Sequence, residues 1–178
     1  MPDDKNKNKP IPPELVDIAF PTLHVRKFTK TPDEVIASHT LEDIFSPRGD
    51  NGISVFQHAA INRPEIAGEM LKKDGVTADH VFMQDNNGNT ALHYAANRGN
   101  EQLARDIIDF NGANSTHLKK KNIREHEAID VLRDKGHEEL AQYLQEKINK
   151  LKATEIASQP AEQTYEPAKS GKPKLRLI

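Results

Sequence analysis

The sequence contains no cysteine, and aromatic residues make up only 5% of it. Without cysteine the chain cannot form a disulfide, a thiolate zinc site or a thiol nucleophile. With so few aromatic side chains, no platform for stacking the bases of single-stranded nucleic acid is visible. Two large classes, disulfide-stabilised scaffolds and cysteine-based enzymes, are therefore excluded.

An excess of charge and long hydrophobic runs are also missing. The formal net charge is −2, from 25 basic and 27 acidic residues, whereas a protein that wraps nucleic acid needs many uncompensated cations. No segment approaches the roughly 18 consecutive apolar residues of a membrane span. The N-terminus lacks the apolar stretch of a secretory signal. We therefore expect a cytoplasmic protein with no membrane span and no nucleic-acid partner.

The two ends of the chain are polar and are expected to be disordered. Inside the N-terminal end, the segment after Pro12 favours one short helix that stops before Pro21. Thr31 begins a clearer helix, with an N-cap, a proline at the first helical position and a glutamate three residues after the cap. A second short helix is expected over residues 41–45. These helices would cover one end of the ordered region.

Three copies of one pattern fill the middle of the chain. The segment that starts at Gly88 matches the segment that starts at Glu125, with an offset of 37 that also relates Gly99 to Gly136. The segment from Gly52 matches the Gly88 segment at an offset of 36, which returns to 37 after a one-residue deletion. Copies that keep register through a deletion indicate a repeat protein. The connecting segments agree as well: Gly75 with Gly112, and Asp85 with Asn122.

Each copy follows the same plan of two helices. In the middle copy, a short apolar helix over residues 91–96 is followed by a turn at Gly99 and a second amphipathic helix. Ala95 and Ala96 are small enough to let neighbouring helices approach closely. Because no copy can bury its apolar face alone, the copies must stack into a solenoid. The apolar face of the second helix consists of Leu103, Ala104, Ile107 and Ile108.

The middle copy resembles the ankyrin repeat family. Residues 90–96 read Thr-Ala-Leu-His-Tyr-Ala-Ala, which is similar to the T-P-L-H-x-A-A signature with Ala91 in the proline position. Gly88 corresponds to the glycine at the tip of the family's hairpin loop, and Gly99 to the glycine between the helices. The copies here are 36 to 37 residues apart, against about 33 in the family, and most of the surplus lies in the connecting loops.

The outer copies depart from the signature. The first has Phe56 and Gln57 in place of leucine and histidine, and it lacks the inter-helix glycine. The third has Glu125, Glu127 and Asp130 where glycine, threonine and histidine would stand. These departures affect the shape of the loops rather than the helical stack.

The resemblance implies an all-α fold, an ankyrin-type helical repeat solenoid with helical caps and disordered termini. We expect a monomer that needs no cofactor. The predicted divisions are a mostly disordered segment 1–30, a helical N-terminal cap 31–48, an ankyrin repeat domain 49–154 with repeats 49–84, 85–121 and 122–154, and a disordered tail 155–178.

His93 is the residue that most invites a catalytic or metal-binding interpretation. No serine elbow, cysteine or carboxylate pair accompanies it in the sequence. The eight histidines include no pair with metal-ligand spacing. By resemblance to the family, Thr90 caps the first helix while His93 bonds to Thr90 and to the loop of the next repeat. We therefore expect no catalytic, cofactor-binding or metal-binding residue, and no enzymatic activity.

Family resemblance also indicates where a protein partner would bind. The concave helix face and the loop tips carry the variable positions of such repeats. Tyr94 and Arg98 are the strongest candidates, because tyrosine and arginine are over-represented among interface hot spots. We expect their joint replacement by alanine to weaken binding while leaving the melting temperature nearly unchanged. The other candidates are His58, Ile61, Asn62, Asn97, Val131, Asp134 and Lys135 on the helices, and Asp85, Asn86, Asn87, Lys119, Lys120 and Lys121 in the loops.

Two further segments admit a structural and a functional interpretation. The last helix has an apolar stripe that caps the stack or docks another protein; the stripe consists of Leu140, Leu144, Ile148 and Leu151. The final residues, 169–178, carry four cations and no acid, and they form either an ordinary tail or an export signal.

The predicted function is non-catalytic binding of a protein partner through the concave helix face and the loop tips. The alternative is a secreted bacterial effector that sequesters a host protein, with the basic tail as its export signal and the host cell as its destination. A small enzyme within residues 1–48 is disfavoured, because that region holds no convergent nucleophile, base and anion-stabilising group.

Overall fold

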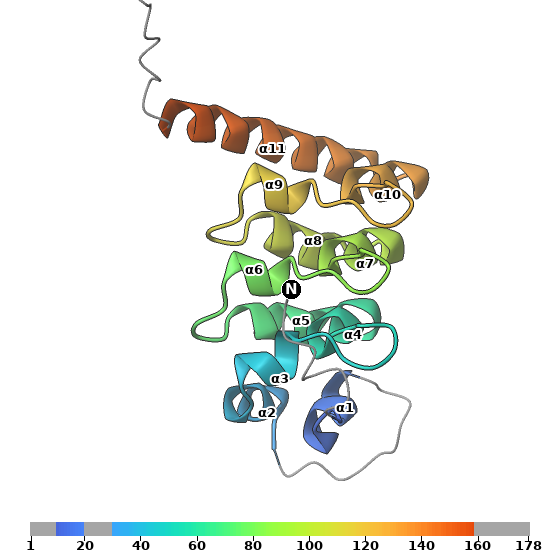
Figure 1. Cartoon of the computed structure of the whole chain (residues 1–178), viewed down its shortest axis with the longest axis vertical. Coiled ribbons are helices and arrows are strands. Elements are labelled where there is room, and N and C mark those ends of the chain that lie inside the picture. The colour runs from blue at the N-terminus through green and yellow to red at the C-terminus, as the bar shows by residue number, and fades with distance from the viewer. Residues whose placement is uncertain (1–9, 20–29, 159–178) are drawn as a thin grey trace, which may run out of the picture.

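The computed structural model describes residues 10–19 and 30–158. Across these ranges the chain is α-helical, and its one β-type pairing is an isolated bridge between Lys121 and Glu127. The helices stack one unit upon another, with the last helix lying across the end of the stack (Figure 1). The predicted all-α helical repeat fold is confirmed. The expected disorder of the chain ends falls mostly on residues 1–9, 20–29 and 159–178, outside the described residues.

Each complete unit contains two main helices and a short third one. The short helices lie in the connecting segments, which explains why the copies are longer than a typical repeat of the family. The units are α4 (Val55–Asn62), α5 (Pro64–Leu71) and α6 (Ala78–Val81), then α7 (Ala91–Arg98), α8 (Glu101–Ile108) and α9 (Ser115–Leu118), and finally α10 (Ala128–Asp134) with α11 (Glu138–Ser158).

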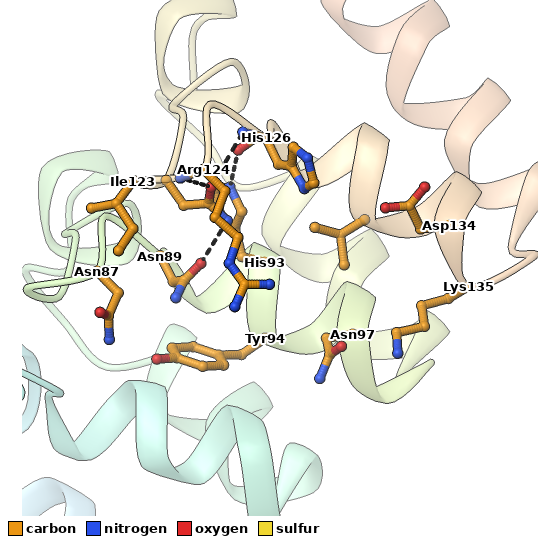
Figure 2. A pocket seen from close by; sticks show the side chains of 12 residues that line it. Asn87, Asn89, His93, Tyr94, Asn97, Ile123, Arg124, His126, Asp134 and Lys135 are labelled. Carbon is orange, nitrogen blue, oxygen red and sulfur yellow. Dashed lines mark hydrogen bonds between the residues drawn. The ribbon is translucent and has the colours of Figure 1, made fainter.

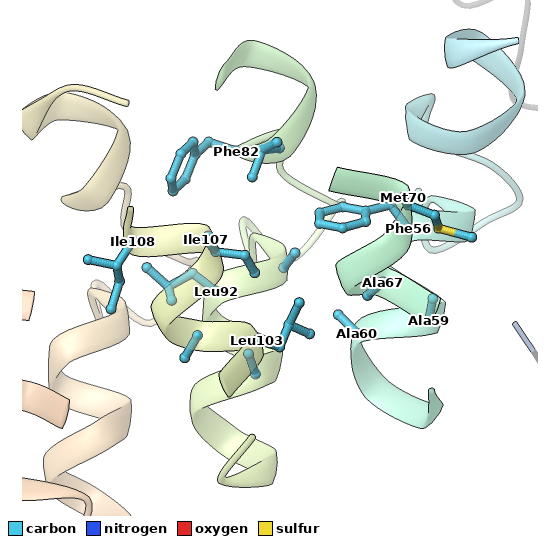
Figure 3. Packing of buried hydrophobic residues seen from close by; sticks show 14 of the residues in the cluster. Phe56, Ala59, Ala60, Ala67, Met70, Phe82, Leu92, Leu103, Ile107 and Ile108 are labelled. Atoms are coloured by element: carbon cyan, nitrogen blue, oxygen red, sulfur yellow. The ribbon is translucent and has the colours of Figure 1, made fainter. Parts of the chain in front are cut away.

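Equivalent helices of successive units pack against each other. The first helices form one layer, in which α4 contacts α7 and α7 contacts α10, and the second helices form another through α5, α8 and α11. Ala59, Ala60, Ala95 and Ala96 are all buried in the first layer, which allows the close approach that their size predicts. Figure 3 shows the apolar side chains of both layers meeting in one continuous core.

The short helices form a third layer held by aromatic contacts. The rings of Phe45 and His80 lie 5.5 Å apart, and those of Phe82 and His117 lie 5.3 Å apart and stack. These four residues are two repeat-equivalent pairs at an offset of 37. The connecting segments are therefore as regular as the main helices.

The N-terminal helices form a fourth, degenerate unit. They are α1 (Pro13–Ala19), α2 (Pro32–Ser38) and α3 (Leu41–Phe45), and they pack on α4, α5 and α6 respectively. All three helices were expected from the sequence, including the Thr31 cap, whose hydroxyl accepts the Glu34 N–H at 3.3 Å. The membership of α1 in the stack was not expected, since residues 1–30 were predicted to be mostly disordered. Leu15, on α1, is fully buried.

Arg48 holds this degenerate unit together from inside. Its side chain is buried and donates to the Asp43 carboxylate at 3.1 Å, to the Asp43 carbonyl at 3.2 Å and to the Pro10 carbonyl at 3.2 Å. A buried guanidinium is costly unless such acceptors surround it. Through these bonds Arg48 connects α3, by way of Asp43, to the segment before α1, by way of the Pro10 carbonyl.

The last helix, α11, closes the opposite end of the stack. Leu140, Leu144 and Ile148 of the predicted stripe are buried, while the outer side of the helix carries exposed polar residues. Near its end the Glu155 carboxylate accepts the Ser115 N–H at 2.8 Å and the Ser115 hydroxyl at 2.6 Å, at the start of α9. The helix runs to residue 158, beyond the predicted start of the tail at 155. The other predicted domain boundaries stay predictions.

One repeat-equivalent position of the inter-unit loops has a left-handed backbone in all three loops. It is Gly52 with φ 66°, Gly88 with φ 73° and Glu125 with φ 61°. A Cβ on Gly88 would lie 2.8 Å from the Cα of Asn122 in the next loop, so glycine is required there. The loop of Glu125 is the last in the stack, and its side chain is 79% exposed. A side chain therefore fits at Glu125, although the backbone conformation remains unfavourable.

Replacing Glu125 with glycine is expected to stabilise the fold by about 0.5–1 kcal/mol, because the left-handed conformation no longer carries a Cβ. Urea denaturation measures the change. Glu125→Ala is the matched control, since it removes the same exposed ion pair with Lys121 but keeps the Cβ. Equal stability of the two variants would contradict a backbone origin.

Candidate functional site

The loops between the units stack in a row through backbone hydrogen bonds. The Asn86 N–H donates to the Asn51 carbonyl at 3.1 Å, and the Ile123 N–H donates to the Asn87 carbonyl at 2.9 Å. The Gln84 side-chain amide adds a bond to the Lys121 carbonyl at 2.9 Å. The tips of these loops are therefore presented in a defined order.

The loops that begin at Asp85 and Asn122 are also held from within by these two side chains. The Asp85 Oδ1 accepts the N–H groups of Asn87 and Asn89, both at 2.8 Å. The Asn122 Oδ1 accepts those of Arg124 at 2.9 Å and His126 at 3.2 Å.

Asp85 points into its own loop, where it accepts these two hydrogen bonds, and it is only 6% exposed. It was a predicted loop contact for a partner, but the structure uses it to shape the loop.

His93 holds the first helix of its unit to the next loop. Its Nδ1 accepts the Thr90 N–H at 3.2 Å, so Nε2 carries the ring hydrogen and donates to the His126 carbonyl at 3.1 Å. Burial lowers the pKa of His93 below its usual 6.5, which favours the neutral ring that this arrangement needs. The structural role expected for His93 is confirmed. Gln57 makes the equivalent bonds in the first unit.

A hollow of about 520 Å³ lies on the side of α7 and α10 that faces the loops (Figure 2). We call it the concave groove. Its floor is formed by α7, its far wall by α10 and its near wall by the loops around residues 87 and 122–126. The groove brings together six residues predicted to bind a partner: Asn87, Tyr94, Asn97, Val131, Asp134 and Lys135.

Tyr94 lines the groove and also supports it. Its hydroxyl donates a hydrogen bond to the Asp85 carboxylate. Burial, followed by this bond, raises the pKa of the Tyr94 phenol well above its usual value. Truncating Tyr94 to alanine would leave the buried Asp85 without this donor, at a cost of about 1–3 kcal/mol. The expectation that a Tyr94→Ala, Arg98→Ala protein melts nearly as the wild type does is therefore revised.

Several predicted contacts lie outside the concave groove. Arg98 is exposed at the end of α7, and Asn86 is exposed at a loop tip. His58, Ile61 and Asn62 occupy the corresponding helix positions on α4. His58 is half-buried, and burial lowers its pKa. These residues extend the same face toward the first unit.

The three predicted loop lysines all have partners inside the fold. Lys120 donates to the Phe82 carbonyl at 2.9 Å, and burial lowers its pKa. Lys119 lies 3.7 Å from the Glu127 carboxylate, and Lys121 lies 3.3 Å from that of Glu125. They stand just before the loop tip rather than on it. This cluster presents less free charge than its sequence indicates.

Sequence reasoning missed Ile123 at the tip of the last loop, and it noted the adjacent Arg124 only as part of the basic cluster with Lys119, Lys120 and Lys121. Ile123 is 69% exposed, and both Ile123 and Arg124 line the groove. The repeat offset of 37 relates them to Asn86 and Asn87, which were named as candidates, so the signal was present. The candidates in this loop were chosen by the charge of the adjacent lysines and not by the repeat register.

Most residues that line the groove can form hydrogen bonds or carry charge. Within residues 10–19 and 30–158, no three His, Asp or Glu side chains converge in a way that could hold a metal ion. In the same ranges, no helix has both the length and the apolar character needed to cross a bilayer.

Comparison with known proteins places the middle copy in a family. Residues 87–121 match the family described as Ankyrin repeat. Among solved structures, the chain is similar to one in the crystal structure of the yeast ribosomal protein Rps3 in complex with its chaperone Yar1. The identity is 22%, the TM-score is 0.49, and the match covers 67% of this chain and 77% of that one. No curated protein matches. The middle copy is therefore an ankyrin repeat, and the units stacked on either side of it follow the same helical plan.

Proposed function

We propose that the chain binds a protein partner without catalysing a reaction, and that the partner lies in the concave groove and against the adjoining loop tips. The observation that carries this proposal is the groove itself, where the loop residue Asn87 and five predicted helix residues line one hollow of about 520 Å³. Pockets that gather a few convergent polar groups are the favoured places for binding.

The groove is rigid and its polar groups are available. Its loops are fixed by backbone bonds to one another, so little ordering of the protein is required when a partner binds. The Asn97 carboxamide and the Lys135 ammonium group are exposed. Neither makes a hydrogen bond or ion pair within the part of the chain that the structure describes.

Filling the groove is expected to abolish binding without unfolding the protein. Asn97→Trp places a bulky, uncharged side chain at an exposed helical position in the groove. Asn149→Trp makes the same change at an exposed position of α11, away from the groove. Wild type and both variants would be used for affinity capture from lysate, followed by quantitative mass spectrometry.

We expect at least one protein whose capture falls more than about tenfold, or about 1.4 kcal/mol, with Asn97→Trp and not with Asn149→Trp. Equal capture by the two variants would refute the groove as the binding site. Arg98→Ala, tested beside them, measures whether the site continues along α7.

A further inference from the structure

Two cations face the concave groove from different elements. Arg124 comes from the last loop, and Lys135 follows the end of α10. Both are exposed. Neither makes an ion pair within residues 10–19 and 30–158, whereas the neighbouring Lys119 and Lys121 each lie beside a glutamate. Figure 2 shows the Arg124 side chain extending into the groove, with Lys135 across from it.

The groove therefore differs in charge from the chain as a whole. Asp134 is its one acidic lining residue, against Arg124 and Lys135. The formal net charge of the whole chain is −2. His93 is held neutral by its buried hydrogen bonds, so it neither adds to this excess nor removes it. The local surplus of one positive charge is complementary to a single negative group.

The remaining lining residues suit a peptide rather than a small ion. The exposed carboxamides of Asn87 and Asn97 have no side-chain partner among the described residues and can both donate to and accept from a peptide main chain. Ile123, 69% exposed, and Val131, half-buried, supply apolar contacts at two sides of the groove.

We propose that the concave groove binds an extended acidic peptide segment of a protein partner, with an aspartate or glutamate side chain between Arg124 and Lys135. Guanidinium groups bind carboxylates through two parallel hydrogen bonds, which makes Arg124 the main contact, while Lys135 adds a point charge. This inference rests on the proposed function and adds the chemical class of the partner.

The test is selection of short random-sequence peptides on the immobilised full-length chain, followed by affinity measurement with the selected peptides. We expect enrichment of aspartate and glutamate. Arg124→Gln and Lys135→Gln are each expected to weaken binding about tenfold, and Asp134→Asn is expected to strengthen it. Arg133→Gln is the matched control, because it removes a cation from the last turn of α10, at an exposed position that does not line the groove.

A second variant keeps the result interpretable if Arg124→Gln folds poorly. Arg124→Lys retains the charge but not the paired donors, and it is expected to bind between wild type and Arg124→Gln. Acidic peptides that bind Arg124→Gln and Lys135→Gln as tightly as wild type would overturn the inference.

The two proposals fail in different ways. Selected peptides that are basic or uncharged, and that Asn97→Trp excludes, would overturn the acidic class while leaving the groove as the binding site. Selection of no peptide that Asn97→Trp excludes would count against the inference and the proposed function together.

Discussion

Replacing Leu92 with alanine is expected to lower the free energy of unfolding by about 2–5 kcal/mol. Leu92 is 1% exposed and belongs to the continuous hydrophobic core of the stack (Figure 3). Alanine would leave a cavity that the neighbouring helices cannot fill, because each is held by its own contacts to the next unit. For a chain of this length the melting temperature should fall by about 4–20 °C.

The control for Leu92 is Ile123→Ala. This change also removes an aliphatic side chain, but from a residue that is 69% exposed, so no cavity forms and the effect should stay within about 0.5 kcal/mol. Urea denaturation followed by circular dichroism measures both variants. A Leu92→Ala protein as stable as Ile123→Ala would show that the middle unit is not the packed centre of the stack.

Replacing His93 with alanine is expected to cost about 2–4 kcal/mol. The change leaves the Thr90 N–H without its acceptor and the His126 carbonyl without its donor, and each such loss costs about 1–3 kcal/mol when the group is buried. It also removes the hydrogen bond that joins α7 to the loop of the next unit. Urea denaturation of the variant measures the loss.

The first unit supplies the matched substitution, His93→Gln. There Gln57 accepts the Ser54 N–H at 2.8 Å and donates to the carbonyls of Met83 and Asn89, both at 3.0 Å. Glutamine can therefore replace both hydrogen bonds of His93, and its variant should lose less than about 1.5 kcal/mol. Equal losses for His93→Ala and His93→Gln would contradict a role in hydrogen bonding.

Comparing wild type with His93→Gln also tests whether protonation of His93 makes the fold sensitive to acid. Burial lowers the pKa of His93 below 6.5 in the folded state, whereas in the unfolded chain it stays near 6.5. Between these two values the unfolded state binds more protons, so the free energy of unfolding falls as the pH drops below about 6.5. Denaturation at about pH 7.5 and about pH 5.5 should show a smaller fall for His93→Gln than for wild type.

A residual fall in the glutamine variant is expected from His58, whose pKa burial also lowers. An unchanged pH dependence in His93→Gln would show that His93 does not contribute to the acid sensitivity of the fold.

Repeat register accounts for how much of the site could be predicted. Helix positions transfer between copies, because a period of 36 to 37 residues returns each side chain to the same face. Tyr94 and Asn97 were found in this way, as were Val131 and Asp134 on α10 and Lys135 just after it, and all five line the groove. The repeat register does not, however, predict whether a polar side chain is buried. Asp85 has the polar character of an interface residue, but its loop closes around it.

In residues 1–48 the comparison of sequence copies did not detect the degenerate unit. These residues contain the helices that the capping and proline signals predict, α1 to α3, but too few matching residues to reveal a fourth unit. The connection between α1 and α2 spans residues 20–31, whereas the residue between α4 and α5 is Arg63 alone. A longer connection breaks the constant offset on which repeat detection depends, so only the packing of α1 on α4 reveals the relation.

The sequence by itself determined the helices, their caps and the stacking of similar units, because each of these depends on residues close together in the chain or on a constant repeat offset. Only the tertiary structure decided which polar side chains are free. Lys120 and Arg124 are both basic residues of one connecting segment, yet Lys120 donates to the Phe82 carbonyl at 2.9 Å and Arg124 lines the groove. That difference arises from the neighbouring unit, which supplies an acceptor to one cation and a hollow to the other.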